Sequence, residues 1–319
     1  MIKTKVWDIK YNFAIDFLRI VAMIFIFGIH FSQRVAFPGS TLFECGAGAV
    51  YIFFTLSGYL AFMSLDKKIS SSDYWKKRCR RILPSYWLLL TLIIFWKMFL
   101  NDIPTDPYRI GFLRYYLGLQ TVIPSDNYDF WNNMYGLWTM SCFILFYCFA
   151  PLLKKWISSL NRAILFLPIS MVLCEITQFL GKNIFTGTNI DKLDVLIGSS
   201  PLNNVYAFAI GIIAYYIIKD KKFYVGFILS AILLIISQMI GLPSLIWCTI
   251  ALLVISGSEA VVVSQEWIIK PIRVLSKYSF YIYLTHMFAF DMAEKIRLIY
   301  FLGEGKGLYV IITFIILVI

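Results

Sequence analysis

The segment AIDFLRIVAMIFIFGIH, residues 14–30, decides the fold class of this chain. It is apolar except for Asp16, Arg19 and His30. An apolar run of about 20 residues is long enough to cross the hydrocarbon core of a bilayer as a helix. No small-residue cleavage site follows the run, and further apolar runs come after it, so it is not a removable signal peptide. We therefore expect a first membrane span over residues 12–32.

The composition supports the same conclusion for the whole chain. Of 319 residues 60% are hydrophobic and 15% are charged, which is outside the range of soluble globular proteins. The net charge of +11 is expected in cytoplasmic loops, and it argues against a nucleic-acid partner. The six cysteines are scattered singly, and we expect them to be small buried hydrophobes.

Ten apolar runs predict an all-α polytopic membrane protein with about ten transmembrane helices. The predicted spans cover residues 12–32, 43–64, 82–100, 135–153, 163–180, 201–218, 223–240, 242–257, 274–292 and 304–319. The stretch 101–134 is broken by prolines and polar residues, so we expect it to be external and partly re-entrant. The chain is predicted to be one transmembrane domain, residues 1–319, without a separate soluble domain.

Charge distribution predicts the orientation of the spans. With a cytoplasmic N-terminus, 19 of the 29 Lys and Arg residues fall in inner loops and nine fall on the outer side. The positive-inside rule favours this arrangement. An even number of spans then returns the C-terminus to the cytoplasm.

The two histidines of the chain, His30 and His286, both lie within predicted spans. Ionisable groups in a membrane are costly and usually functional. With the predicted orientation both lie at a similar depth toward the outer side, where they can meet in one cavity. The alternative is that His30 is a hydrogen-bonded histidine of the bundle without a role in a reaction.

Arg19 precedes His30 by eleven residues. This separation is roughly 1,100° of helical rotation, about 20° from three full turns, and a rise of about 16 Å. We therefore expect both side chains on one helix face, along a line comparable in length to the pantetheine arm of coenzyme A. The alternative for Arg19 is a snorkelling arginine that pairs with Asp16.

A basic segment, DYWKKRCRRILPSYW at residues 73–87, leads into the third predicted span. Arg78 and Arg81 are three residues apart and share a face if the helix has begun, so they and Lys77 are candidates to bind a phosphate group. The alternative is a loop that sets the topology and contacts only anionic lipid headgroups.

Five blocks of the sequence resemble the membrane-bound acyltransferase-3 family. They are AIDFLRIVAMIFIFGIH (14–30), VYIFFTLSGYLAF (50–62), RCRRILPSYW (78–87), LWTMSCFILFYCFAPLL (137–153) and LSKYSFYIYLTHMF (275–288). In the first block the family's acid, its basic residue and its histidine correspond to Asp16, Arg19 and His30. One departure is that many members carry a Glu shortly after the Trp of the fourth span, where this chain has Ser141 to Ile144 without an acid. The sequence is more similar to the branch that includes acetyl and succinyl transferases and proteins described as polysaccharide exporters.

The resemblance implies transfer of an acyl group, most often acetyl, from cytoplasmic acyl-CoA to a hydroxyl of an extracytoplasmic glycan or lipid-linked sugar. Acetyl-CoA would be the co-substrate, and no metal is implied. The implied setting is O-acetylation of bacterial cell-surface polysaccharide by a multi-pass protein of the plasma (inner) membrane. The partners would then be acyl-CoA, a carbohydrate acceptor and membrane lipid, and a homodimer is compatible with the sequence.

We assign candidate roles accordingly. His30 is the expected general base, and the catalytic candidates are His30, Arg19, His286 and Glu175. Glu175 lies in the middle of a predicted span, where it either holds an imidazole or is a protonated structural acid. The candidates for contact with acyl-CoA are Arg78, Arg81, Lys77 and Arg19. The candidates for contact with the acceptor are Trp138, Tyr283 and Tyr147.

Two other classes of function remain open from the sequence. In a polysaccharide or small-solute exporter the same intramembrane polar residues would line a solute or proton path. A structural membrane subunit is the third reading, but it leaves the two intramembrane histidines unexplained.

Overall fold

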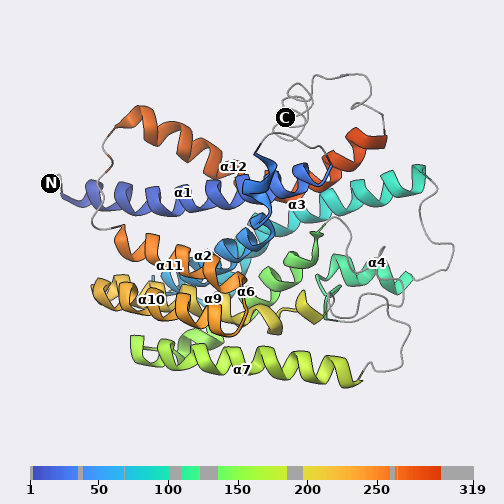
Figure 1. Cartoon of the computed structure of the whole chain (residues 1–319). Coiled ribbons are helices and arrows are strands. Elements are labelled where there is room, and N and C mark those ends of the chain that lie inside the picture. Colours follow the sequence, from blue (N-terminus) through green and yellow to red (C-terminus); the bar gives the residue numbers. More distant parts are fainter. Residues whose placement is uncertain are drawn as a thin grey trace. The chain divides into compact units, whose positions relative to one another are not determined.

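A computed structural model describes residues 3–34, 39–67, 69–100, 109–122, 136–184, 197–258, 263 and 265–295. Every regular element among these residues is helical (Figure 1), which confirms the all-α prediction for this part of the chain. The helices are α1 (Lys3–Ser32), η1 (Ser40–Phe43), η2 (Gly46–Ala49), α2 (Val50–Leu65), α3 (Ser71–Phe99), α4 (Arg109–Tyr116), α6 (Trp138–Trp156), α7 (Leu160–Ile184), η4 (Leu202–Asn204), α9 (Val205–Lys219), α10 (Phe223–Met239), α11 (Ser244–Gly257) and α12 (Glu266–Lys295).

Among the described residues, five helical segments are long and apolar enough to cross a membrane. They are Phe13–Ser32, Ser40–Leu65, Ser71–Phe99, Leu160–Ile184 and Leu202–Lys219. Two apolar helices, α10 and α11, are shorter. Each predicted span up to residue 292 overlaps one or more described helices, and the last, 304–319, lies outside the described residues. The count of about ten spans and the cytoplasmic position of both ends stay predictions.

The basic segment that precedes the third predicted span is helical rather than a loop. The α3 helix begins at Ser71, and the Ser70 side chain accepts a hydrogen bond from the backbone N–H of Asp73 at 3.0 Å. This N-cap and the acid in the first turn stabilise a helix start at that point. Residues 76–81 are therefore part of α3.

A short helix lies in the stretch that we expected to be external and partly re-entrant. The α4 helix is held to α3 by two side chains that donate to its last carbonyl groups: Tyr86 Oη lies 2.6 Å from Tyr115 O, and Trp87 Nε1 lies 2.9 Å from Tyr116 O. Residues 101–108 and 123–135 lie outside the described part of the chain, and the external position stays a prediction.

The chain forms two compact units. The first unit holds residues 1–53 and 221–319, and the second holds residues 54–220. In the first unit α1 packs along α12, and α10 packs against α11. Gly46 lets η2 approach α1, because a Cβ at this position would collide with the backbone carbonyl of Phe25.

The second unit is built around α9, which is buried from Tyr206 to Ile217. A helix that is apolar on all sides is typical of such a central position. The α7 helix packs against α9. The α2 backbone approaches α9 closely at Gly58 and Gly211, where added Cβ atoms would collide with the carbonyl oxygens of Phe208 and Thr55. Small residues commonly permit such close crossings of membrane helices.

The expectation that all cysteines are buried is wrong for half of them. Cys142, Cys174 and Cys248 are buried, whereas Cys45, Cys79 and Cys148 are exposed, and all six are free thiols. In an apolar chain an exposed thiol can face hydrocarbon instead of the protein core, so hydrophobic surroundings in the sequence do not imply burial within the fold.

The crossing of α2 and α9 leads to a first prediction. Gly211→Ala should lower the thermal unfolding temperature of the purified protein in detergent, with a loss of stability of about 1–3 kcal/mol, because a methyl group has no space against the Thr55 backbone. Gly198→Ala is the matched control, since nothing lies within 4 Å of a Cβ at that glycine. Equal unfolding temperatures for the two variants would contradict the close backbone approach.

Candidate functional site

The α1 and α12 helices bring the two histidines together in the first unit. The ring centroids of His30 and His286 are 5.3 Å apart, and the ring planes are inclined by 33°. His286 is buried, while His30 is partly exposed. The rings of Tyr283 and Phe290 lie 5.8 and 6.1 Å from His286. His30 is thus the more accessible imidazole of a pair that is set in aromatic surroundings.

Hydrogen bonds determine which ring nitrogen is basic. His286 Nδ1 lies 2.5 Å from the carbonyl oxygen of Tyr283. A carbonyl only accepts, so Nδ1 carries the proton and Nε2 holds the lone pair in the neutral ring. His286 Nε2 has no hydrogen-bond partner within the described part of the chain. His30 Nδ1 lies 3.1 Å from Gln33 Oε1, and donation to this oxygen leaves His30 Nε2 as the basic atom.

An arginine at the end of α1 holds the histidine turn against α12. Arg34 Nη1 donates to the carbonyl oxygen of His30 at 2.7 Å, and Arg34 Nε lies 2.6 Å from Glu294 Oε1. The guanidinium also lies 5.1 Å from the ring centroid of Phe290. Sequence analysis missed Arg34, Gln33 and Glu294 as site residues. The available signal was spacing, since Gln33 and Arg34 follow His30 by three and four residues, one helical turn.

Arg19 also faces α12. Its Nη1 lies 3.5 Å from Asp16 Oδ1 and 3.5 Å from Ser276 Oγ, and Ser276 donates to Asp16 at 2.6 Å. Arg19 and His30 therefore share one face of α1, as their spacing predicts. The ion pair with Asp16 is the contact that the alternative interpretation named. Contact of Arg19 with acyl-CoA and a catalytic role stay predictions.

The remaining predicted site residues lie in the second unit. Arg78 Nη2 donates to Leu60 O at 3.0 Å and to Ser64 Oγ at 3.1 Å. Its guanidinium lies 5.3 and 4.7 Å from the ring centroids of Tyr74 and Tyr147. Arg78 thus joins the C-terminal part of α2 to α3 and α6, a favourable place for a cation at a helix end.

Lys77 and Arg81 are exposed on α3. Arg81 follows Arg78 by three residues in a helix that has begun before both, so the condition that we set for a shared face is met. Binding of CoA phosphates by Lys77, Arg78 and Arg81 stays a prediction.

The structure places the candidates for contact with the acceptor and the candidate acid, Glu175, as follows. Tyr147 Oη donates to Ser57 Oγ at 3.0 Å, and the Trp138 ring packs edge-on at 5.8 Å from the Phe54 ring. Glu175 is exposed on α7 and makes no hydrogen bond or ion pair with any described residue. The roles of Trp138, Tyr147, Tyr283 and Glu175 stay predictions.

Sequence analysis also missed an ionic cluster at the end of α2. Asp66 Oδ1 lies 2.8 Å from Lys219 Nζ and 3.3 Å from Lys154 Nζ. Burial alone would raise the pKa of Asp66, but hydrogen bonds from Lys219 and Tyr215 and the charge of Lys154 outweigh it and lower the pKa to about 2. The cluster joins the ends of α2, α6 and α9. Within the described residues no group of three or more His, Cys, Asp or Glu side chains suits a metal ion.

A comparison with protein families identifies the class of protein. The model of the acyltransferase-3 family, described as an acyltransferase domain, matches residues 12–319. The chain therefore belongs to this family and is a helical membrane protein with an acyltransferase domain. No curated protein and no solved structure matches the chain.

The ionic cluster leads to a second prediction. The folded-state pKa of Asp66 is lower than its ordinary value of 3.8, so its contribution to stability is present above about pH 4 and is lost as the pH falls toward 2. Asp66→Asn should therefore lower the unfolding temperature at pH 6, and its difference from the wild type should shrink between pH 4 and 2. Asp220→Asn, at an exposed acid after α9, is the control. A difference that is independent of pH over this range would contradict the assignment.

Proposed function

We propose that this protein transfers an acyl group, acetyl in the simplest case, from cytoplasmic acyl-CoA to a hydroxyl of an extracytoplasmic glycan or lipid-linked sugar. Membership in the acyltransferase-3 family supports the reaction class. The observation that carries the proposal is the pair of imidazoles at 5.3 Å, in which hydrogen bonds at Nδ1 direct the lone pair to Nε2. Such an arrangement supplies a general base at a fixed position.

His30 is the proposed base because it is the more accessible ring. Its Nε2 takes the proton of the acceptor hydroxyl while the oxygen attacks the thioester carbonyl. The tetrahedral intermediate then collapses, the carbon–sulfur bond breaks, and the imidazolium returns the proton to the departing CoA thiolate. The products are an O-acyl ester and free CoA. General-base catalysis contributes about 10² to 10⁴ in rate, and positioning of the two substrates must contribute much of the rest.

The surroundings of His30 support such positioning. Arg34 holds the backbone carbonyl of His30 and binds Glu294 of α12, so the turn that carries the base is held at two points. The Gln33 side chain orients the ring. His286 packs against His30 and is the second candidate for proton transfer. Two cations at this distance would repel each other, so the pair is suited to the uptake of one proton.

The third prediction tests the base. Purified protein in sealed vesicles is incubated with radiolabelled acetyl-CoA and a saccharide acceptor, and release of CoA and transfer of label are measured. His30→Ala should reduce transfer by about 10²- to 10⁴-fold. The variant should still fold and bind acetyl-CoA, which is checked by the unfolding temperature with and without acetyl-CoA.

Lys277→Ala, at an exposed position of α12, is the matched control and should transfer label at the wild-type rate. Wild-type turnover of the His30 variant would refute the role of this residue. Flux of a solute that does not depend on CoA, without transfer of label by the wild type, would favour the exporter function.

The fourth prediction concerns the donor. Arg81→Ala should raise the KM for acetyl-CoA by about 10- to 100-fold, the effect of losing one charged hydrogen bond, with little change in kcat. Arg80→Ala is the matched control, because this residue is equally exposed in the same basic segment and points about 100° away around the helix. Equal changes in KM for both variants would indicate a general electrostatic role of the segment.

A further inference from the structure

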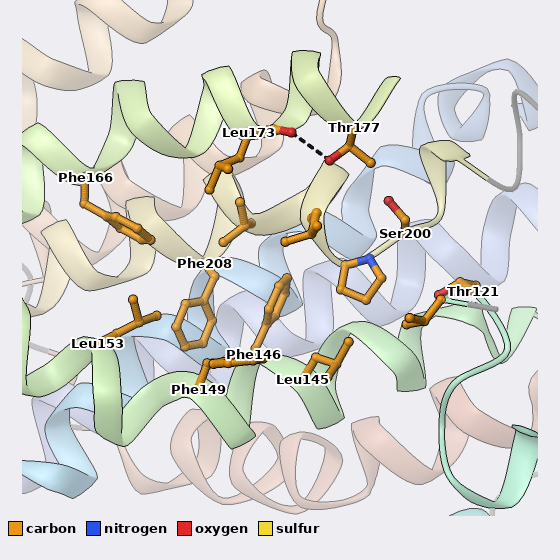
Figure 2. A pocket seen from close by; sticks show the side chains of 14 residues that line it. Thr121, Leu145, Phe146, Phe149, Leu153, Phe166, Leu173, Thr177, Ser200 and Phe208 are labelled. Carbon is orange, nitrogen blue, oxygen red and sulfur yellow. Dashed lines mark hydrogen bonds between the residues drawn. The ribbon is translucent and has the colours of Figure 1, made fainter. Parts of the chain in front are cut away.

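A cavity of about 620 Å³ lies in the second unit, among α6, α7, η4 and α9 (Figure 2). It is partly open to the surroundings of the protein, where its lining residues Val122, Phe149 and Leu202 are exposed. Eleven of its fourteen lining residues are Leu, Val, Phe or Pro, and the other three are Thr or Ser. No lining residue carries a charge, so the cavity does not suit a nucleotide or another phosphorylated group. Such a lining suits a hydrocarbon ligand.

The few polar side chains gather at one end of this cavity. Figure 2 shows Thr121, Thr177 and Ser200 at one end and Leu153 and Phe166 at the other. The Thr177 hydroxyl donates to the Leu173 carbonyl at 2.7 Å. Thr121 is only 4% exposed, and its hydroxyl oxygen has no hydrogen-bond partner among the described residues. A buried hydroxyl without a partner is costly, so this end is suited to a ligand with a polar group.

The cavity is elongated along the helices. Its lining extends from Leu145 to Leu153 on α6 and from Phe166 to Thr177 on α7, which corresponds to about 12 Å and 16 Å of helix. An apolar space of this length, with polar groups at one end, suits an extended aliphatic chain. A compact sugar would leave its hydroxyl groups without partners along most of this length.

We propose that the cavity binds one aliphatic chain of a membrane amphiphile. The end of the chain lies near Leu153 and Phe166, and its junction with the polar headgroup lies beside Thr121 and Ser200. Lipid tails are as apolar as these side chains, so van der Waals fit and the hydrogen bond to the Thr121 hydroxyl provide the preference for this site over the bulk bilayer.

The orientation predicted from the sequence indicates from which leaflet the amphiphile enters the cavity. Thr121 belongs to the stretch that we expect on the outer side, so the amphiphile would enter from the outer leaflet with its headgroup outward. A bilayer phospholipid and a lipid-linked saccharide share this chemistry. The proposal rests on the lining of the cavity alone and holds whether or not His30 is a catalytic base.

The experiment uses a sixteen-carbon fatty acid that carries a diazirine at the middle of its chain. The full-length protein is reconstituted in nanodiscs with this probe and irradiated, and the labelled peptides are identified by mass spectrometry. We expect label on residues 145–153 and 166–177. An excess of unlabelled fatty acid should compete for these positions.

Three variants distinguish the cavity from general contact with lipid. Val205→Phe fills the cavity from the start of α9 and should reduce the label on the lining at least fivefold. Val172→Phe makes the same enlargement on the exposed face of α7, about 120° around the helix from Phe166, and should leave the label unchanged. Thr121→Val keeps the shape but removes the hydroxyl, and it should weaken competition by fatty acid. Unfolding temperatures show whether each variant is folded.

A second measurement and three contrary outcomes complete the test. Native mass spectrometry of the protein extracted from membranes should reveal a bound amphiphile that is absent from Val205→Phe; a phospholipid mass or a polyisoprenoid-linked saccharide mass would each support the proposal and identify the source. Label that is spread evenly over the exposed faces of α7, or that survives Val205→Phe, would overturn the proposal. A lining that stays unlabelled would also overturn the proposal, because it would mean that the protein itself fills the cavity and excludes the probe.

Discussion

The requirement that polar side chains in apolar surroundings find partners determines how α1 and α12 pack. Asp16 and Arg19 bind each other and Ser276. About four turns further, just beyond the end of α1, the Arg34 guanidinium joins the backbone of His30 to Glu294. An unpaired charge at either place would be costly in a membrane. These two polar contacts fix the rotation of α1 about its own axis relative to α12. The same rotation places the imidazoles of His30 and His286 side by side.

The same physical requirement operates in the second unit, where it organises helix ends. Arg78 donates to a carbonyl near the end of α2, and Asp66, just beyond that end, binds lysines of α6 and α9. Cations near a helix C-terminus interact favourably with its carbonyl groups. The lining of the apolar cavity carries no charge and so needs few polar partners. Its one exception is the buried Thr121 hydroxyl, which has no partner among the described residues. Ionic contacts at the helix ends therefore hold these helices together, and the apolar cavity lies between the helices.

The helices could be located from the sequence because their apolar runs are long. Runs of about 20 apolar residues located the helices well, because a membrane span must satisfy its own backbone hydrogen bonds as a helix. The third predicted span begins at residue 82, eleven residues after the start of α3, since hydropathy reports the apolar part of a helix and not its polar first turns. Burial was less predictable, as the three exposed cysteines show. In an apolar chain the same composition suits a side chain that faces the protein core and one that faces lipid.

The sequence by itself determined that this protein is helical and belongs in a membrane, and the spacing of Arg19 and His30 placed both on one helix face, because these properties depend on the composition and period of single segments. The pairing of residues far apart in the chain was decided only by the tertiary structure. His30 and His286 are separated by about 250 residues, and Arg34 and Glu294 by a similar length, so no local pattern connects them. The cavity in the second unit likewise depends on how four helices leave space between them. Such a space is a property of packing and has no counterpart in any one segment.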